Sequence, residues 1–152
     1  PEFMKEWVAE KFLETIYPKG TKEFLDTAPK IPFKLVPIID FRAVRFAHFD
    51  CESMLYFISA NSCLNALHLS MNRLDPASLD MINRKLLACT WPVIRTLDIS
   101  FNRLDVSVVR NLISAVQNNP TIHTLKLAGC NINPTGADII ARFLDGNKEI
   151  VD

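Results

Sequence analysis

Residues 94–104 read Ile94-Arg95-Thr96-Leu97-Asp98-Ile99-Ser100-Phe101-Asn102-Arg103-Leu104, with aliphatic residues at positions 1, 4, 6 and 11 and an asparagine at position 9. The same pattern begins thirty residues earlier, at Leu64, and twenty-eight residues later, at Ile122. Positions 4 and 6 alternate with polar or small residues, which predicts a short strand with one buried face. One such strand cannot bury its own apolar face, whereas stacked copies can. The repetition therefore predicts a solenoid built from these units.

Position 9 lies where each predicted strand ends and the chain turns inward. It holds Asn72, Asn102 and Cys130 in the three copies. An asparagine amide has two donors and an acceptor, so it can satisfy backbone groups of a buried turn. A cysteine fills the same place as a small apolar residue with a weak donor. We expect these three residues to form a structural ladder along the solenoid.

A helix is predicted after each copy. The pairs that follow position 11 are Asp75-Pro76, Asp105-Val106 and Asn133-Pro134. Asp and Asn are favoured N-caps, and Pro is favoured at the first helical position. Apolar residues then keep helical spacing, and Pro, Asn or Gly ends each segment. Strand, turn, cap and helix therefore recur as one unit.

The three copies in register resemble the leucine-rich repeat family, in its long-repeat form similar to ribonuclease inhibitor. The resemblance covers about residues 41–150. It implies an α/β leucine-rich repeat solenoid, a curved parallel sheet with helices on its convex side. The choice of Asn or Cys at position 9 is what the ribonuclease-inhibitor-like class has.

The sequence suggests the following organisation. Residues 1–3 precede Met4 and are interpreted as a cloning remnant. Residues 4–40 are predicted to form an α-helical N-terminal cap that covers the first edge of the solenoid; an apolar arm for another protein is the alternative. The repeats are expected at residues 41–63, 64–93, 94–121 and 122–149, and Ile150 would begin a further one. That register predicts a chain excised from a longer protein, with an open C-terminal edge.

The first of these repeats is degenerate. Phe41, Val44, Phe46 and Cys51 are assigned to positions 1, 4, 6 and 11, but Phe49 replaces the asparagine of position 9. The departure leaves the inward turn of this unit in doubt, although not its strand.

Composition excludes several classes of function. The 17 basic and 17 acidic residues give a net charge of zero, which argues against nucleic acid or an anionic membrane as the main partner. No apolar run approaches the roughly 18 residues that span a bilayer. The four cysteines show no paired short spacing, so they are interpreted as free thiols in a cytoplasmic protein. The three histidines lack the spacing of a metal site, and no cofactor is expected.

The concave face should carry the side chains that flank positions 4 and 6. Position 5 contributes a charged column of Arg45, His68, Asp98 and Lys126. Position 8, at the strand's exit, contributes His48, Met71, Phe101 and Gly129. These columns are interpreted as a protein-binding strip with Phe101 as its anchor. The alternative for the charges is that they are solvated and pair along the sheet, where each pair contributes only about 0–1 kcal/mol.

A catalytic function is not predicted. His68 beside Asp98 lacks a nucleophile in a matching position, and an open sheet cannot exclude water. The four glycines form no phosphate-binding loop.

The predicted function is a non-enzymatic protein-interaction module, an adaptor or scaffold domain of a larger cytoplasmic protein, whose partner is another protein on the concave face. One alternative is a regulator of a small GTPase or of actin that acts through Arg73 or Arg103 on the repeat rim. Another is a cytoskeletal building block that self-associates, with the open C-terminal edge as a possible contact. Fold alone does not choose among them.

Overall fold

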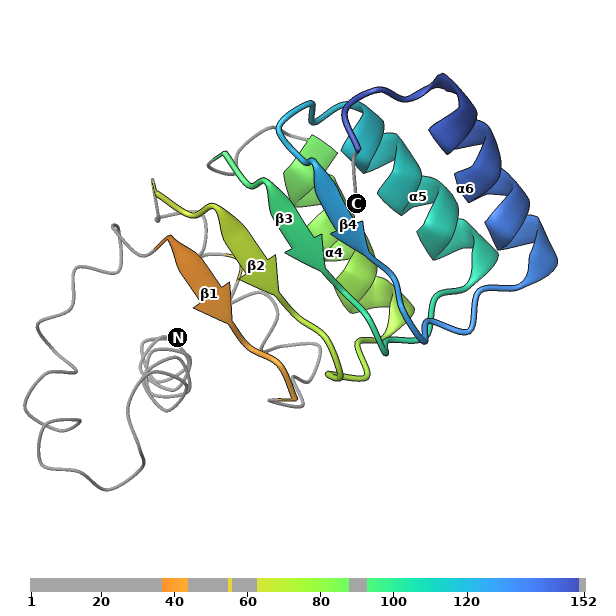
Figure 1. Ribbon diagram of the computed structural model, residues 1–152. Helices are drawn as coiled ribbons and strands as arrows, with labels where there is room; N and C mark the ends of the chain where they lie inside the picture. Colours follow the sequence, from red (N-terminus) through yellow and green to blue (C-terminus); the bar gives the residue numbers. More distant parts are fainter. Residues whose placement is uncertain (1–36, 44–54, 56–62, 88–92, 151–152) are drawn as a thin grey trace, which may run out of the picture.

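The structure is a computed structural model that describes residues 37–43, 55, 63–87 and 93–150. Strands and helices alternate along most of this chain (Figure 1). In order they are β1 (Ile38–Asp40), β2 (Ala66–His68), α4 (Pro76–Leu87), β3 (Thr96–Asp98), α5 (Val106–Gln117), β4 (Thr124–Lys126) and α6 (Pro134–Gly146). The α/β class that the repeats predict is confirmed.

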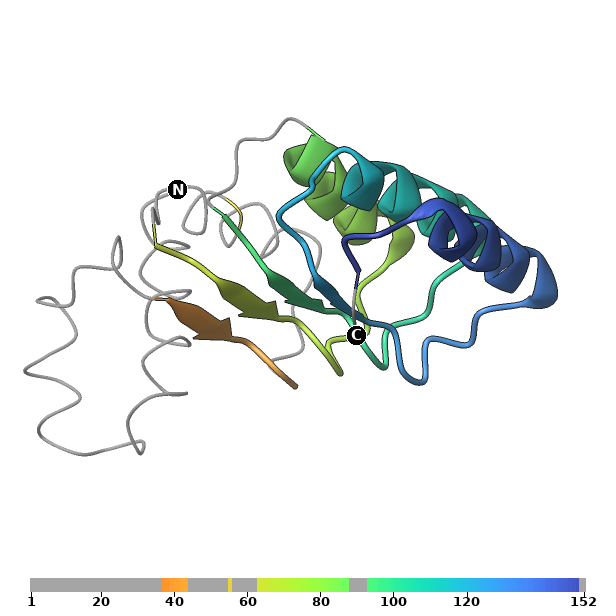
Figure 2. The ribbon, with the colours of Figure 1, turned by 45° about the horizontal axis from the view of Figure 1, so that its top comes forward.

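The four strands form one parallel sheet in the order β1-β2-β3-β4. Leu67, Leu97 and Leu125 align across the sheet, so position 4 of each repeat faces the same position in its neighbours. The helices α4, α5 and α6 lie together on one side of the sheet (Figure 2). Among the described residues no helix covers the other side, which we call the open face.

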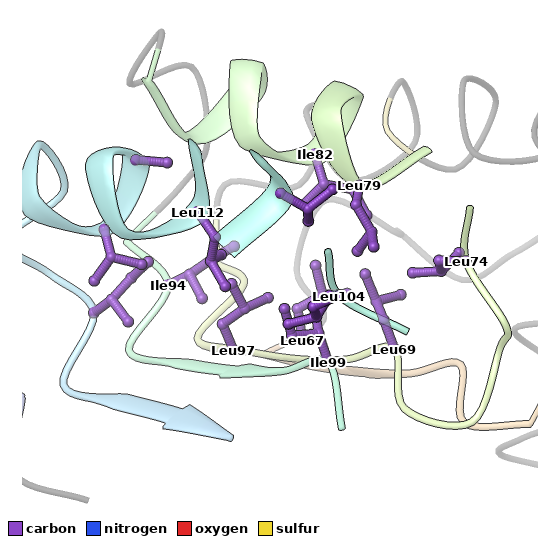
Figure 3. Close-up of a cluster of buried hydrophobic side chains, with 14 of the residues drawn as sticks. Leu67, Leu69, Leu74, Leu79, Ile82, Ile94, Leu97, Ile99, Leu104 and Leu112 are labelled. Carbon is purple, nitrogen blue, oxygen red and sulfur yellow. The ribbon is translucent and has the colours of Figure 1, made fainter. Parts of the chain in front are cut away.

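The core lies between the sheet and the helices (Figure 3). It is built from positions 1, 4, 6 and 11, because alternation along each strand sends positions 4 and 6 to one side. Those positions in the first two copies are at most 3% exposed. They are Leu64, Leu67, Leu69, Leu74, Ile94, Leu97, Ile99 and Leu104. Leu79 and Ile82 of α4 and Leu112 of α5 close the core from the helical side.

Each helix begins at the predicted cap. The side chains of Asp105 and Asn133 accept hydrogen bonds from the amides of Val108 and Gly136, three residues on. Asp75 does the same for the amide of Ser78, at 2.7 Å. These bonds satisfy amides that have no partner inside the helix, so the caps fix where α4, α5 and α6 start.

Burial decreases at β4. Leu125 and Leu127 are only partly buried, whereas Leu97 and Ile99 at the same positions of the preceding copy are at most 1% exposed. Ile99 donates its amide to Lys126 at 3.1 Å, but among the described residues no carbonyl accepts from the equivalent amide of Leu127. Within the described chain, β4 is therefore an edge of the sheet.

The register predicted for the first repeat is wrong. Ile39 pairs with Leu67 and therefore occupies position 4, and the amide of Phe41 bonds to the carbonyl of His68 as a position-6 residue does. Phe41 was expected at position 1, so the strand lies five residues earlier than predicted and falls inside the segment assigned to the N-terminal cap. The pattern of apolar residues fits both registers, but only the earlier one lets Ile39 and Phe41 fill the core. The rest of the predicted cap and residues 44–54 lie outside the described residues.

Candidate functional site

The open face ends at a left-handed residue in each of the four described repeats. The residue at position 8 has a left-handed backbone each time, with φ between 56° and 62°. The four residues are Ala43, Met71, Phe101 and Gly129. A left-handed residue reverses the chain just after the strand, and at this turn two large apolar side chains point into solvent. Met71 is 55% exposed and Phe101 is 57% exposed.

Phe101 is supported by a glycine in the next repeat. A β-carbon placed on Gly129 would lie 2.5 Å from Cδ1 and 2.6 Å from Cε1 of the Phe101 ring. The ring therefore occupies the space that a side chain at position 129 would need. The exposed aromatic ring therefore packs on one side against the next repeat and presents its other side to solvent, as an anchor residue would.

A charged column runs beside these apolar side chains. Position 5 of the four repeats holds Asp40, His68, Asp98 and Lys126, which the register of the sheet places side by side. His68 Nδ1 lies 3.5 Å from Asp98 Oδ2, an ion-pair distance without hydrogen-bond geometry. Asp98 Oδ1 accepts the amide of Ser100 at 3.0 Å. The structure thus brings together three of the predicted charged residues: His68, Asp98 and Lys126.

Arg45 and His48 were assigned to this surface in the register that the structure corrects. Positions 5 and 8 of the first repeat belong instead to Asp40 and Ala43. Arg45 and His48 themselves lie outside the described residues, so their place in a binding strip stays a prediction without a column to support it.

Asp40 and Arg42 are open-face residues that the sequence interpretation missed. Arg42 Nε donates to both carboxylate oxygens of Asp40 at 2.9 Å. Partial burial raises the pKa of Asp40, but the hydrogen bonds from Arg42 outweigh it and leave the pKa below its ordinary value. The repeat spacing could have identified them: Ile39 precedes Leu67 by 28 residues, as Leu97 precedes Leu125, whereas Val44 precedes Leu67 by only 23.

The position-9 side chains lie inside the turn. Asn102 Nδ2 donates to the carbonyls of Leu69 and Ile99, at 3.1 Å and 2.9 Å, and its Oδ1 accepts the amide of Leu74 at 2.9 Å. Asn72 likewise donates to the carbonyls of Phe41 and Leu69. Each asparagine therefore joins the turn of its own repeat to the preceding one.

Cys130 makes weaker contacts in the same place. Its Sγ lies 3.5 Å from the carbonyl oxygen of Ile99 and 3.7 Å from that of Ala128. Burial raises the pKa of the Cys130 thiol, which keeps it protonated and able to donate. A buried protonated thiol of this kind is a packing group rather than a nucleophile.

Two hollows lie at the rim where the strands lead into the helices, each about 420 Å³ in volume. Arg73, Leu74 and Arg103 line both of them. Phe101 and Gly129 line the first, and Asp75 and Asp105 line the second. The exposed ring of Phe101 is thus continuous with a rim that carries two arginines.

Among the described residues, no nucleophile accompanies the pair of His68 and Asp98 on the open face. Ser100, the serine nearest Asp98 in the chain, is 5% exposed, and its hydroxyl accepts the amide of Ala128 at 3.2 Å. It is therefore committed to the fold and not available to a His68–Asp98 pair. Among the described residues, no group of three His, Cys, Asp or Glu side chains could hold a metal ion. None of the described helices combines the length and the apolar character of a membrane span.

Comparison with known proteins agrees with the repeat geometry. The Leucine Rich repeat family model matches residues 60–82 and 118–141. A FERM domain-containing protein C of Dictyostelium discoideum is 30% identical over 90 residues, which are 59% of this chain but 6% of that protein. The chain is therefore similar to leucine-rich repeats in the two matched segments, and its parallel sheet with three capped helices fits a solenoid of such repeats.

Proposed function

We propose that this chain is a non-enzymatic protein-interaction module, and that its partner binds the open face around Phe101. Leucine-rich repeats generally act as binding modules, which favours this function over catalysis. The match to a small part of a much longer FERM domain-containing protein favours an adaptor or scaffold segment of a multidomain cytoplasmic protein. The proposed contact residues are Met71 and Phe101 with the neighbouring charges of His68, Asp98 and Lys126.

The exposed ring of Phe101 in a left-handed backbone is the observation that carries the proposal. The fold requires φ near +56° at this position, and glycine adopts it at the least cost. A bulky side chain there is unusual, and such outliers cluster at functional sites. The ring is also 57% exposed, so the core gains little from it. A costly residue that contributes little to folding is best explained by a contact with another molecule.

The charged column gives such a partner an orientation. Lys126 is exposed at one end, and the Asp40–Arg42 pair lies at the other. Because charged groups near an apolar anchor set register and association rate more than affinity, we expect them to tune which partner docks. The proposed surface therefore combines one apolar centre with charges of both signs.

The test compares two exposed apolar residues. Leu144 on α6 is 50% exposed and serves as the control. The parent, Phe101→Ala and Leu144→Ala chains are used to capture proteins from cytoplasmic extract, and the most enriched protein is then purified and titrated directly. We expect Phe101→Ala to weaken this complex by about 1–3 kcal/mol and Leu144→Ala to leave it unchanged. Equal affinities for the parent and Phe101→Ala would contradict the proposal.

A further inference from the structure

The two hollows at the rim share a pair of arginines from neighbouring repeats. Arg73 and Arg103 both occupy position 10, one residue after the ladder asparagine, and both are exposed. Neighbouring strands of a sheet lie about 4.8 Å apart, so the two repeats bring both arginines to the same stretch of rim, where both line the two hollows. Among the described residues, no ion pair or side-chain hydrogen bond involves either guanidinium.

The carboxylates that line the second hollow are bound elsewhere. Asp75 accepts the amide of Ser78 at 2.7 Å, and Asp105 accepts the amide of Val108 at 2.8 Å. Each caps the start of a helix, where the positive end of the helix dipole offsets its charge. Asp75 and Asp105 thus line the same hollow as the two arginines, but within the described part of the chain neither arginine forms an ion pair. A carboxylate brought by a partner would give each guanidinium a direct counter-charge.

An apolar contact lies next to these charges. Phe101 lines the first hollow together with both arginines, and its ring lies beside Gly129. A ligand that filled this hollow would meet the ring on one side and the guanidinium groups on the other. The combination fits a segment that carries both carboxylates and one large apolar side chain.

We propose that the rim binds an extended acidic segment of the partner protein, in which alternate carboxylates pair with Arg73 and Arg103 and an adjacent apolar side chain packs on Phe101. Alternate residues of an extended chain are about 6.6 Å apart and neighbouring strands about 4.8 Å apart, a difference that the long arginine side chains span. This inference rests on the proposed function, since it names the chemistry of the segment that docks at the same anchor.

The experiment uses a fluorescent peptide with glutamates at alternate positions beside a single tryptophan, titrated with the 152-residue chain. Arg73→Gln and Arg103→Gln should each weaken binding by up to about fivefold, the range of an exposed ion pair, and the double variant by more. Arg110→Gln removes the same charge from the exposed surface of α5 and should change nothing. Added salt should weaken the binding of the parent chain. The parent chain should bind a peptide with glutamine in place of every glutamate as weakly as the double variant binds the glutamate peptide.

The outcomes separate this inference from the proposed function. The proposal of an acidic segment would be overturned if the peptide did not bind, or if both arginine variants bound it as tightly as the parent chain. The captured partner could still depend on Phe101, and the proposed function would then stand. Binding of an oligouridylate that exceeds peptide binding and ignores Phe101→Ala would assign the arginines to nucleic acid and likewise overturn the inference. Unchanged unfolding midpoints for the arginine variants exclude misfolding as the cause of lost binding.

Discussion

The ring of Phe101 lies directly against the α-carbon of Gly129 in the next repeat. Any side chain at position 129 would collide with it, since a β-carbon there would be 2.5 Å from the ring. Both residues have left-handed backbones, with φ of 56° and 62°. The glycine thus serves two purposes: it adopts its turn without strain, and it leaves a flat surface for an aromatic ring.

Gly129→Ala should therefore lower stability and displace the ring. A left-handed conformation costs an L-residue about 1–2 kcal/mol, and this cost should appear in denaturant unfolding. The collision adds a second cost that Phe101→Ala removes. We expect a double-mutant cycle to show that Gly129→Ala is less harmful when Phe101 is absent. Strict additivity of the two changes would mean that ring and glycine do not touch.

Phe101→Ala on its own should barely change stability. The phenylalanine is 57% exposed, so its removal creates no cavity. Phe143 in α6 provides the matched comparison, because it is 5% exposed, and Phe143→Ala should cost about 3–5 kcal/mol. Both values come from urea titrations of the same chain. A large loss for Phe101→Ala would place that residue in the core and remove it from the binding surface.

Asn102→Ala should destabilise the inward turn. It leaves the carbonyls of Leu69 and Ile99 and the amide of Leu74 without their partner, at about 1–3 kcal/mol for each buried group. Asn102→Cys should cost less, since Cys130 occupies the equivalent place in the next repeat. Asn65→Ala, at an exposed position, is the control and should be neutral. Thermal unfolding measures all three, and an Asn102→Ala chain as stable as the parent would contradict the ladder.

The cap of α5 should make the free energy of unfolding depend on pH in the acid range. Hydrogen bonds from the Ser107 hydroxyl and the Val108 amide hold the pKa of Asp105 below its ordinary value of 3.8. Because the pKa is lowered by folding, the stabilisation is complete above about pH 4 and is lost as the pH falls through the folded-state pKa.

Two substitutions separate the charge of Asp105 from its cap. Asp105→Ala should cost about 1 kcal/mol at neutral pH. Asp105→Asn keeps the cap, as Asn133 does for α6, and should lose less stability than the parent on acidification. The measurement is urea unfolding across the acid range. Parallel pH profiles for the parent and Asp105→Asn would mean that the Asp105 carboxylate does not contribute.

Hydrogen exchange should be fastest at β4 within the sheet. Ile99 donates its amide to Lys126, whereas the Leu127 amide has no acceptor among the described residues. We expect the Leu127 amide to exchange faster than that of Ile99 in a dilute sample. Protection of Leu127 that rises with protein concentration would indicate that the edge pairs with a second copy. Equal protection in a monomeric sample would contradict the assignment of β4 as an edge.

Much of this fold could be predicted because the same physical requirement recurs in each repeat. Leu67, Leu97 and Leu125 are spaced by 30 and 28 residues, and the caps Asp105 and Asn133 follow at equal offsets. The register of the first repeat was predicted wrongly because the apolar pattern alone allows Phe41 to occupy either position 1 or position 6. Only the requirement that parallel strands align resolves them, and that requirement concerns contacts between repeats rather than residues within one.

The candidate site was harder to predict for a similar reason. Sequence position identified Phe101 as an exposed aromatic residue, but its support by Gly129 depends on the left-handed turn of two repeats. Arg73 and Arg103 form no ion pair within the described residues, although Asp75 and Asp105 line the same hollow, because those carboxylates accept helix amides. Such competition for a carboxylate is decided by geometry, which spacing along the chain does not specify.

The turn at position 8 also has a consequence for how such a surface can change over generations. The same backbone conformation carries a methyl group, a thioether chain, an aromatic ring and a lone hydrogen at Ala43, Met71, Phe101 and Gly129. Because the side chains at Met71 and Phe101 are exposed, a substitution at this position can change what the molecule recognises without disturbing the core, where the next repeat leaves room for it as Gly129 does for Phe101. New partners could thus be acquired one repeat at a time, by single substitutions of exposed side chains that do not pack in the core.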